Sequence, residues 1–112
     1  MEKIDYLPLG SVVFVRNGIK ELMIIARCLG AKINDEVQMF DYGACTYPEG
    51  LLGDQIMYFN HEDIDKVIFS GYSNEMDSRM VATLNDFMEK TDIKRGNPYD
   101  LNIQNMNLKA KI

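Results

Sequence analysis

The first part of the chain alternates between short apolar runs and turn residues, a pattern typical of β-strands. Residues 11–15 (SVVFV) form a β-branched and aromatic run, and residues 22–27 (LMIIAR) form a second one. Asn17-Gly18 lies between them and favours a tight turn, because both residues tolerate a positive φ. The pattern therefore predicts a β-hairpin at the start of the fold.

Two more strands are expected in the middle of the chain. Residues 30–36 are polar and turn-like, and residues 37–44 then predict a third strand that bends at Gly43. The Pro and Gly of the segment 47–50 (YPEG) mark a turn, and an apolar loop follows before residues 55–59 return as a fourth strand.

Residues 60–72 combine a helical turn with a last strand. Asn60 is a capping residue, and the acids Glu62 and Asp63 suit the first turn of a helix, where backbone amides are unpaired. Residues 66–72 then predict the fifth strand. Five short strands with a helical turn before the last predict a small, five-stranded antiparallel, SH3-like β-barrel.

The apolar period changes to helical spacing after this barrel. An amphipathic helix is predicted to about Thr91, with Asp77 or Ser78 as its cap. One face of it carries the apolar side chains of Met76, Met80, Val81, Leu84, Phe87 and Met88. The expected fold is α+β in a single domain 1–112, with a β-rich core at 7–75, a helical segment at 76–96 and a C-terminal arm at 97–112.

Composition and charge narrow the possible partners. The chain has 112 residues, 46% hydrophobic and 26% charged, as in an ordinary globular domain. Its net charge of -5 lacks the basic footprint that phosphate neutralisation needs, so no nucleic acid is expected. Charges at Glu2, Lys3 and Asp5 and the lack of a long apolar run predict a cytoplasmic protein without membrane contact.

Few residues suggest chemistry. His61 is the only histidine, and its acidic neighbours lack a metal-ligand spacing, so no metal is expected. The glycines are spread over separate turns and form no phosphate-binding motif, so no cofactor is expected. Cys45 with His61 leaves a small enzyme as a minor alternative, although two reduced and mostly buried thiols are the plainer reading of Cys28 and Cys45.

The remaining signal is for protein binding. The helical stripe is either core or a binding groove, and Tyr42, Tyr47 and Tyr58 are either an exposed aromatic patch or part of the barrel wall. The candidate protein-binding residues are Tyr42, Tyr47, Pro48, Leu51, Leu52, Met80, Leu84, Phe87 and Met88. Nothing in the pattern indicates whether copies of the chain associate.

Several segments occur in an order that resembles one protein family. They are residues 7–13 (LPLGSVV), 22–27 (LMIIAR), 41–50 (DYGACTYPEG) and 59–72 (FNHEDIDKVIFSGY). Together they resemble the small Firmicute proteins grouped as the domain of unknown function 4176, over about residues 7–75.

The resemblance implies a role but no catalytic residues. Such proteins look like accessory components encoded beside type VII secretion genes, near the LXG-type toxins that those systems export. The implied role is a non-enzymatic cytoplasmic chaperone or targeting factor that holds a toxin before export. An immunity protein, which neutralises a toxin with its acidic surface, is the closest alternative.

Overall fold

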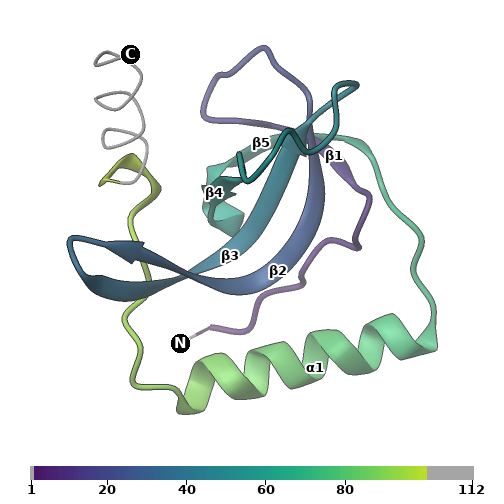
Figure 1. Ribbon diagram of the computed structural model, residues 1–112. Coiled ribbons are helices and arrows are strands. Elements are labelled where there is room, and N and C mark those ends of the chain that lie inside the picture. Colours follow the sequence, from purple (N-terminus) through teal and green to yellow (C-terminus); the bar gives the residue numbers. More distant parts are fainter. Residues whose placement is uncertain (1, 101–112) are drawn as a thin grey trace.

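In the computed structural model, which describes residues 2–100, five antiparallel strands form one sheet and a helix packs beside it (Figure 1). The elements are β1 (Val12–Val15), β2 (Leu22–Ile33), β3 (Glu36–Thr46), β4 (Met57–Phe59), a 3-10 turn (His61–Asp63), β5 (Ile64–Phe69) and α1 (Glu75–Lys90). These elements confirm the α+β class, the helical turn before the last strand and the C-terminal helix.

The predicted closure into an SH3-like barrel is wrong. The strand order is β4-β3-β2-β1-β5, so β4 and β5 are the two edges of an open sheet. Closing a barrel requires the two edge strands to pair along their length. β4 has only three residues, and β5 carries two register shifts against β1, which twist an edge away from further pairing.

The predicted first hairpin is confirmed, but its turn is displaced by one residue. β1 and β2 pair antiparallel, with Val12 opposite Met23 and Val13 opposite Leu22. Arg16 and Asn17, not Asn17 and Gly18, take positive φ values of 48° and 60°.

The second hairpin is longer than predicted, because residues 30–33 continue β2 and do not form a turn. Only Asn34 and Asp35 make the connection, with φ values of 51° and 65°, and Ile33 pairs with Glu36 across it. Both residue types tolerate the left-handed region that a two-residue hairpin requires. The predicted bend at Gly43 stays a prediction; the register shift nearest to it lies in β2, between Ile24 and Ala26, and Ala26 pairs with Gly43.

The main core lies between the sheet, the N-terminal segment and α1. Figure 1 shows the N-terminal segment running between the helix and the sheet. The backbone of Ile4 donates to and accepts from the Asn85 side chain, and the N–H of Leu7 donates to the Tyr42 hydroxyl. The buried cluster consists of Tyr6, Val13, Val15, Leu22, Ile24, Tyr42, Ala44 and Phe59.

Helix α1 begins and ends earlier than its sequence suggested. Asn74, not Asp77 or Ser78, caps it, because the Asn74 side chain accepts the Asp77 N–H at 3.0 Å. The helix ends at Lys90, and the predicted helical segment beyond that point is not helical. Residues 101–112, most of the predicted C-terminal arm, lie outside the described residues. No helix within residues 2–100 is long and apolar enough to cross a membrane.

Candidate functional site

A buried carboxylate lies in the middle of β3, at Asp41. The side chain is 0% exposed, and its Oδ2 accepts the N–H of His61 at 2.8 Å and an N–H of the Arg95 guanidinium. Arg95 also donates to both carboxylate oxygens of Glu62, at 2.8 and 2.6 Å. These donors offset part of the cost of burying the charge of Asp41, whose Oδ1 is buried without a hydrogen-bond partner among residues 2–100, and the Arg95 contact lowers the pKa of Glu62.

The segment after α1 follows β3 because of this contact. The N–H of Met39 donates to the Lys94 carbonyl and the N–H of Gly96 donates to the Met39 carbonyl, both at 2.8 Å. Asn60 closes the arrangement from the other side, donating to the Gly96 carbonyl at 2.9 Å and accepting the Asp41 N–H at 3.0 Å. The result is a polar junction whose hydrogen bonds connect β3, the 3-10 turn and the segment after α1.

The groups that could support catalysis are engaged or buried. Burial raises the pKa of Tyr42 to about 12, and its hydroxyl shares a hydrogen bond with Nδ1 of His61, 2.8 Å away. Burial, reinforced by the charge of Asp41, raises the pKa of the Cys28 thiol, and Cys45 is only 1% exposed. A thiol is a nucleophile as its thiolate, so these environments disfavour attack by either cysteine.

The part of the chain that the structure describes contains no candidate metal-binding site. Among residues 2–100, no three His, Cys, Asp or Glu side chains gather in a way that could hold a metal ion.

Comparison with known proteins shows the family of this chain. Residues 6–80 match the family model described as domain of unknown function (DUF4176). The chain belongs to this family. The matched region of the DUF4176 protein holds all five strands and the first turns of α1, whereas Arg95 and the segment that it anchors lie beyond it. No curated protein and no solved structure matches the chain.

One surface of the DUF4176 protein exposes large apolar side chains on two loops. We call Ile19, Tyr47, Leu51 and Leu52 the loop patch. Ile19, in the β1–β2 loop, is 95% exposed, and Leu51 and Leu52, in the β3–β4 loop, are 49% and 54% exposed. Apolar side chains gathered at an exposed site in this way often mark a binding surface.

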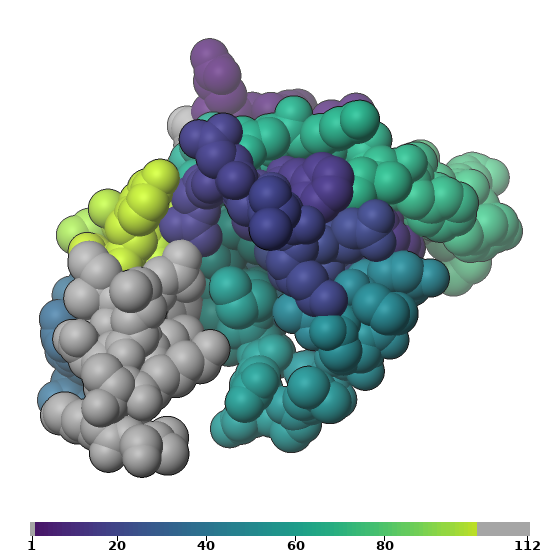
Figure 2. Space-filling view, turned by 90° about the horizontal axis from the view of Figure 1, so that it is seen from above, coloured from purple at the N-terminus to yellow at the C-terminus, as the bar shows by residue number. Residues whose placement is uncertain are grey.

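Polar contacts hold the two loops of this patch together. The Lys20 ammonium lies 2.7 Å from the Glu49 carboxylate, and the N–H of Tyr47 donates to the Glu21 carbonyl at 3.0 Å. The Lys20 contact lowers the pKa of Glu49. Figure 2 shows the β1–β2 loop near the centre of this face, with the β3–β4 loop beside it. The loop patch is therefore one composite surface that two separate parts of the sequence form.

Helix α1 presents a second apolar surface. Its inner face packs on the core through Val81 and Leu84 and buries Met88. A neighbouring stripe, which we call the helix flank, leaves Met76, Met80 and Phe87 exposed, with Met76 at 73%. The predicted apolar stripe thus divides into a core side and an exposed side.

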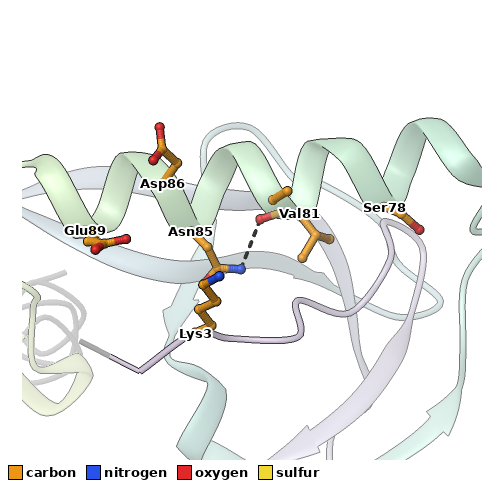
Figure 3. A pocket seen from close by; sticks show the side chains of 7 residues that line it. Lys3, Ser78, Val81, Asn85, Asp86 and Glu89 are labelled. Carbon is orange, nitrogen blue, oxygen red and sulfur yellow. Dashed lines mark hydrogen bonds between the residues drawn. The ribbon is translucent and has the colours of Figure 1, made fainter.

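A shallow hollow also runs beside α1, with a volume of about 290 Å³ (Figure 3). It is lined by Lys3, Ser78, Val81, Ala82, Asn85, Asp86 and Glu89. Both charge signs border it, and Asp86 already pairs with Lys90 at 3.1 Å. Lys3 and Glu89 bring opposite charges to it, so the hollow favours neither an anion nor a cation, and the loop patch and helix flank are the better candidates for binding.

The sequence candidates divide between surface and interior. Tyr47, Pro48, Leu51, Leu52, Met80 and Phe87 are exposed. Tyr42 is buried in the main core cluster, Leu84 packs against that cluster, and Met88 is buried, so none of these three offers a free binding surface. The structure also adds Ile19, whose only signal in the sequence is an isolated apolar residue inside a polar turn.

Proposed function

We propose that the DUF4176 protein is a non-enzymatic, cytoplasmic accessory or chaperone protein that binds an LXG-type toxin before its export by a type VII secretion system. The observation that carries the proposal is the loop patch. Four large apolar side chains are exposed on two loops that an ion pair and a backbone hydrogen bond hold together. Such a preorganised apolar surface loses little conformational entropy when a partner covers it.

The interior supports a binding role over a catalytic one. The buried carboxylate at Asp41 is used to hold the Arg95 segment in place, and the thiols of Cys28 and Cys45 are in environments that keep them protonated or inaccessible. The charged groups of the polar junction are therefore used to hold the fold together. The choice of a toxin as the partner rests on the family resemblance.

Co-purification with the toxin encoded in the neighbouring gene tests the proposal. The tagged chain should recover the toxin from cells, and a Leu51→Ser, Leu52→Ser variant should recover much less of it. Deletion of the gene should lower toxin export or toxin stability. If no toxin is recovered and deletion changes neither quantity, the proposal is wrong.

Co-expression separates this role from an immunity role, which the net charge of -5 also suits if the surface covers a basic active site. A chaperone permits export without necessarily protecting the cell. An immunity protein must restore growth of cells that produce the active toxin. Restored growth without any effect on export would assign the immunity role.

A further inference from the structure

The outer surface of α1 carries a stripe of charged side chains. If the order of this stripe is reversed, every acid takes the position of a base and every base that of an acid. Glu75, Arg79, Asp86 and Lys90 lie in one stripe at helical spacing, and their signs alternate along it. Glu75 and Lys90 lie equally far from the midpoint of the pattern, and so do Arg79 and Asp86. All four side chains are exposed, since the pairs Arg79–Glu75 and Lys90–Asp86 are 74%/79% and 73%/60% exposed.

The exposed apolar stripe of the same helix is arranged around nearly the same midpoint. Met76 lies toward one end of the helix flank, Phe87 toward the other, and Met80 lies between them. The small residues Ala82 and Thr83 occupy the midpoint itself. Small residues at this position allow the backbones of two helices to approach each other closely.

We infer that α1 binds α1 of a second copy of this chain, antiparallel and related by a two-fold axis. Reversing the order of charges places Glu75 against Lys90 of the second copy and Arg79 against Asp86 of the second copy. Each acid thus meets a base, and the two cis pairs become two four-membered ionic clusters. A two-fold interface requires such self-complementarity, because both copies contribute the same surface.

The same symmetry also matches the apolar stripes. A two-fold axis perpendicular to the plane of two antiparallel helices keeps each flank on its own side of the contact. The helix flank therefore meets the helix flank, with Met76 near Phe87 of the second copy, while charges meet charges on the other side. Burial of these three side chains supplies the hydrophobic gain, and the ordered charges fix the antiparallel register.

A second copy fits this surface better than an unrelated protein does. The complementarity to a reversed copy involves four charges in one exposed stripe of the helix, whereas Glu89 lies beside that stripe, where it lines the hollow. The loop patch has no comparable series of charges, because the Lys20 and Glu49 beside it come from two different loops. The inference therefore leaves the loop patch free for the toxin proposed above, and it goes beyond that function.

The contact is expected to be weak, because one helix of 16 residues is about 24 Å long and offers only a small interface. Sedimentation equilibrium of the full chain over a wide concentration range should show a reversible monomer–dimer equilibrium. If the chain sediments as a monomer at every concentration, the inference is overturned.

Two charge variants test the register. Glu75→Lys with Asp86→Lys makes the four positions basic, and Arg79→Glu with Lys90→Glu makes them acidic. Each variant alone should have its dimer dissociation constant raised about tenfold or more, because like charges then face each other. An equimolar mixture should form a heterodimer. If both variants dimerise like the original chain, or the mixture stays monomeric, the antiparallel pairing is wrong.

A matched control and a second readout complete the test. Glu36→Lys with Asp54→Lys introduces the same charge change at exposed positions at the start of β3 and in the β3–β4 connection and should leave the dimer unchanged. Circular dichroism checks that every variant keeps its helix and sheet. Both charge variants should still recover the toxin through the loop patch. A monomeric original chain whose helix variants lose the toxin would instead assign the helix flank to the toxin and reject the dimer.

Discussion

The buried carboxylate of Asp41 binds the guanidinium of Arg95, 54 residues later, and this contact ties β3 to the segment after α1. Arg95 is itself 30% exposed and extends outward to Glu62. A single guanidinium therefore joins the centre of the sheet, the 3-10 turn and the C-terminal part of the described chain. Because Asp41 is buried and Arg95 is partly exposed, removal of Arg95 would leave the carboxylate of Asp41 buried without its counter-ion. This determines the free-energy cost of the removal.

Replacing Arg95 with Met should lower the free energy of unfolding by about 3 kcal/mol. The carboxylate of Asp41 would stay buried and keep only the His61 N–H as a donor. Urea denaturation measures the change. Arg79→Met removes an exposed helical ion pair and should cost below about 1 kcal/mol. Equal losses in the two variants would contradict the structural role of Arg95.

Gly96→Ala should destabilise the protein by about 1–3 kcal/mol through overpacking. An ideal Cβ at this position would lie 2.4 Å from Cζ of the buried Phe40 ring, so the ring or the segment must shift. The same substitution should cost less in a Phe40→Leu background, where the ring is absent. An unchanged penalty in that background, measured by urea denaturation, would mean that the ring is not the obstacle.

Asn85→Ala should cost about 2 kcal/mol and loosen the N-terminal segment. The Asn85 side chain accepts the Ile4 N–H at 2.7 Å and donates to the Ile4 carbonyl at 2.8 Å. Hydrogen exchange at the Ile4 amide should accelerate in this variant. Asn85→Asp keeps the acceptor but loses the donor, so we expect an intermediate rate, and three identical rates would contradict the bridge.

Stability should decline as the pH rises above about 10. Burial, together with the charge of Asp41, raises the pKa of Tyr6, and burial raises that of Tyr42 to about 12. The folded state thus holds these two protons more tightly than the unfolded state. Their contribution is complete below the unfolded pKa of about 10 and is lost as the pH rises through the folded pKa.

Tyrosinate absorbance measures this alkaline transition. Tyr6 and Tyr42 should ionise only well above about pH 10, together with unfolding. Ionisation of all six near pH 10 in a protein that remains folded would contradict the burial of the two phenols.

The local elements of this fold could largely be predicted from the sequence, because short-range signals determine them. β-Branched runs, the capping residue Asn60 and the helical spacing after Met76 all gave elements that the structure contains. Boundaries failed where two residues compete for one role, as at Asn74 and Asp77, since both can cap a helix start.

Long-range relationships could not be predicted in this way. Nothing local in the sequence pairs Asp41 with Arg95, and an acid inside a strand reads as a solvent-facing position until its partner is known. The predicted closure of the sheet into a barrel was wrong for the same reason, because closure depends on how β4 and β5 lie relative to each other. In the candidate site, Leu51 and Leu52 could be predicted because they lie in an apolar loop. Ile19 could be assigned to the same surface only from the contact between Lys20 and Glu49, which the sequence does not show.

The most direct test of the proposed function is the affinity of the purified chain for the purified neighbouring toxin, measured by isothermal titration calorimetry. We expect the original chain to bind, Leu51→Ser with Leu52→Ser to weaken binding about tenfold or more, and Val37→Ser to leave it unchanged. Val37 is a matched control, because it is 46% exposed but lies in the β2–β3 hairpin, which contributes no residue to the loop patch. If the original chain does not bind, or all three chains bind equally, the account is contradicted.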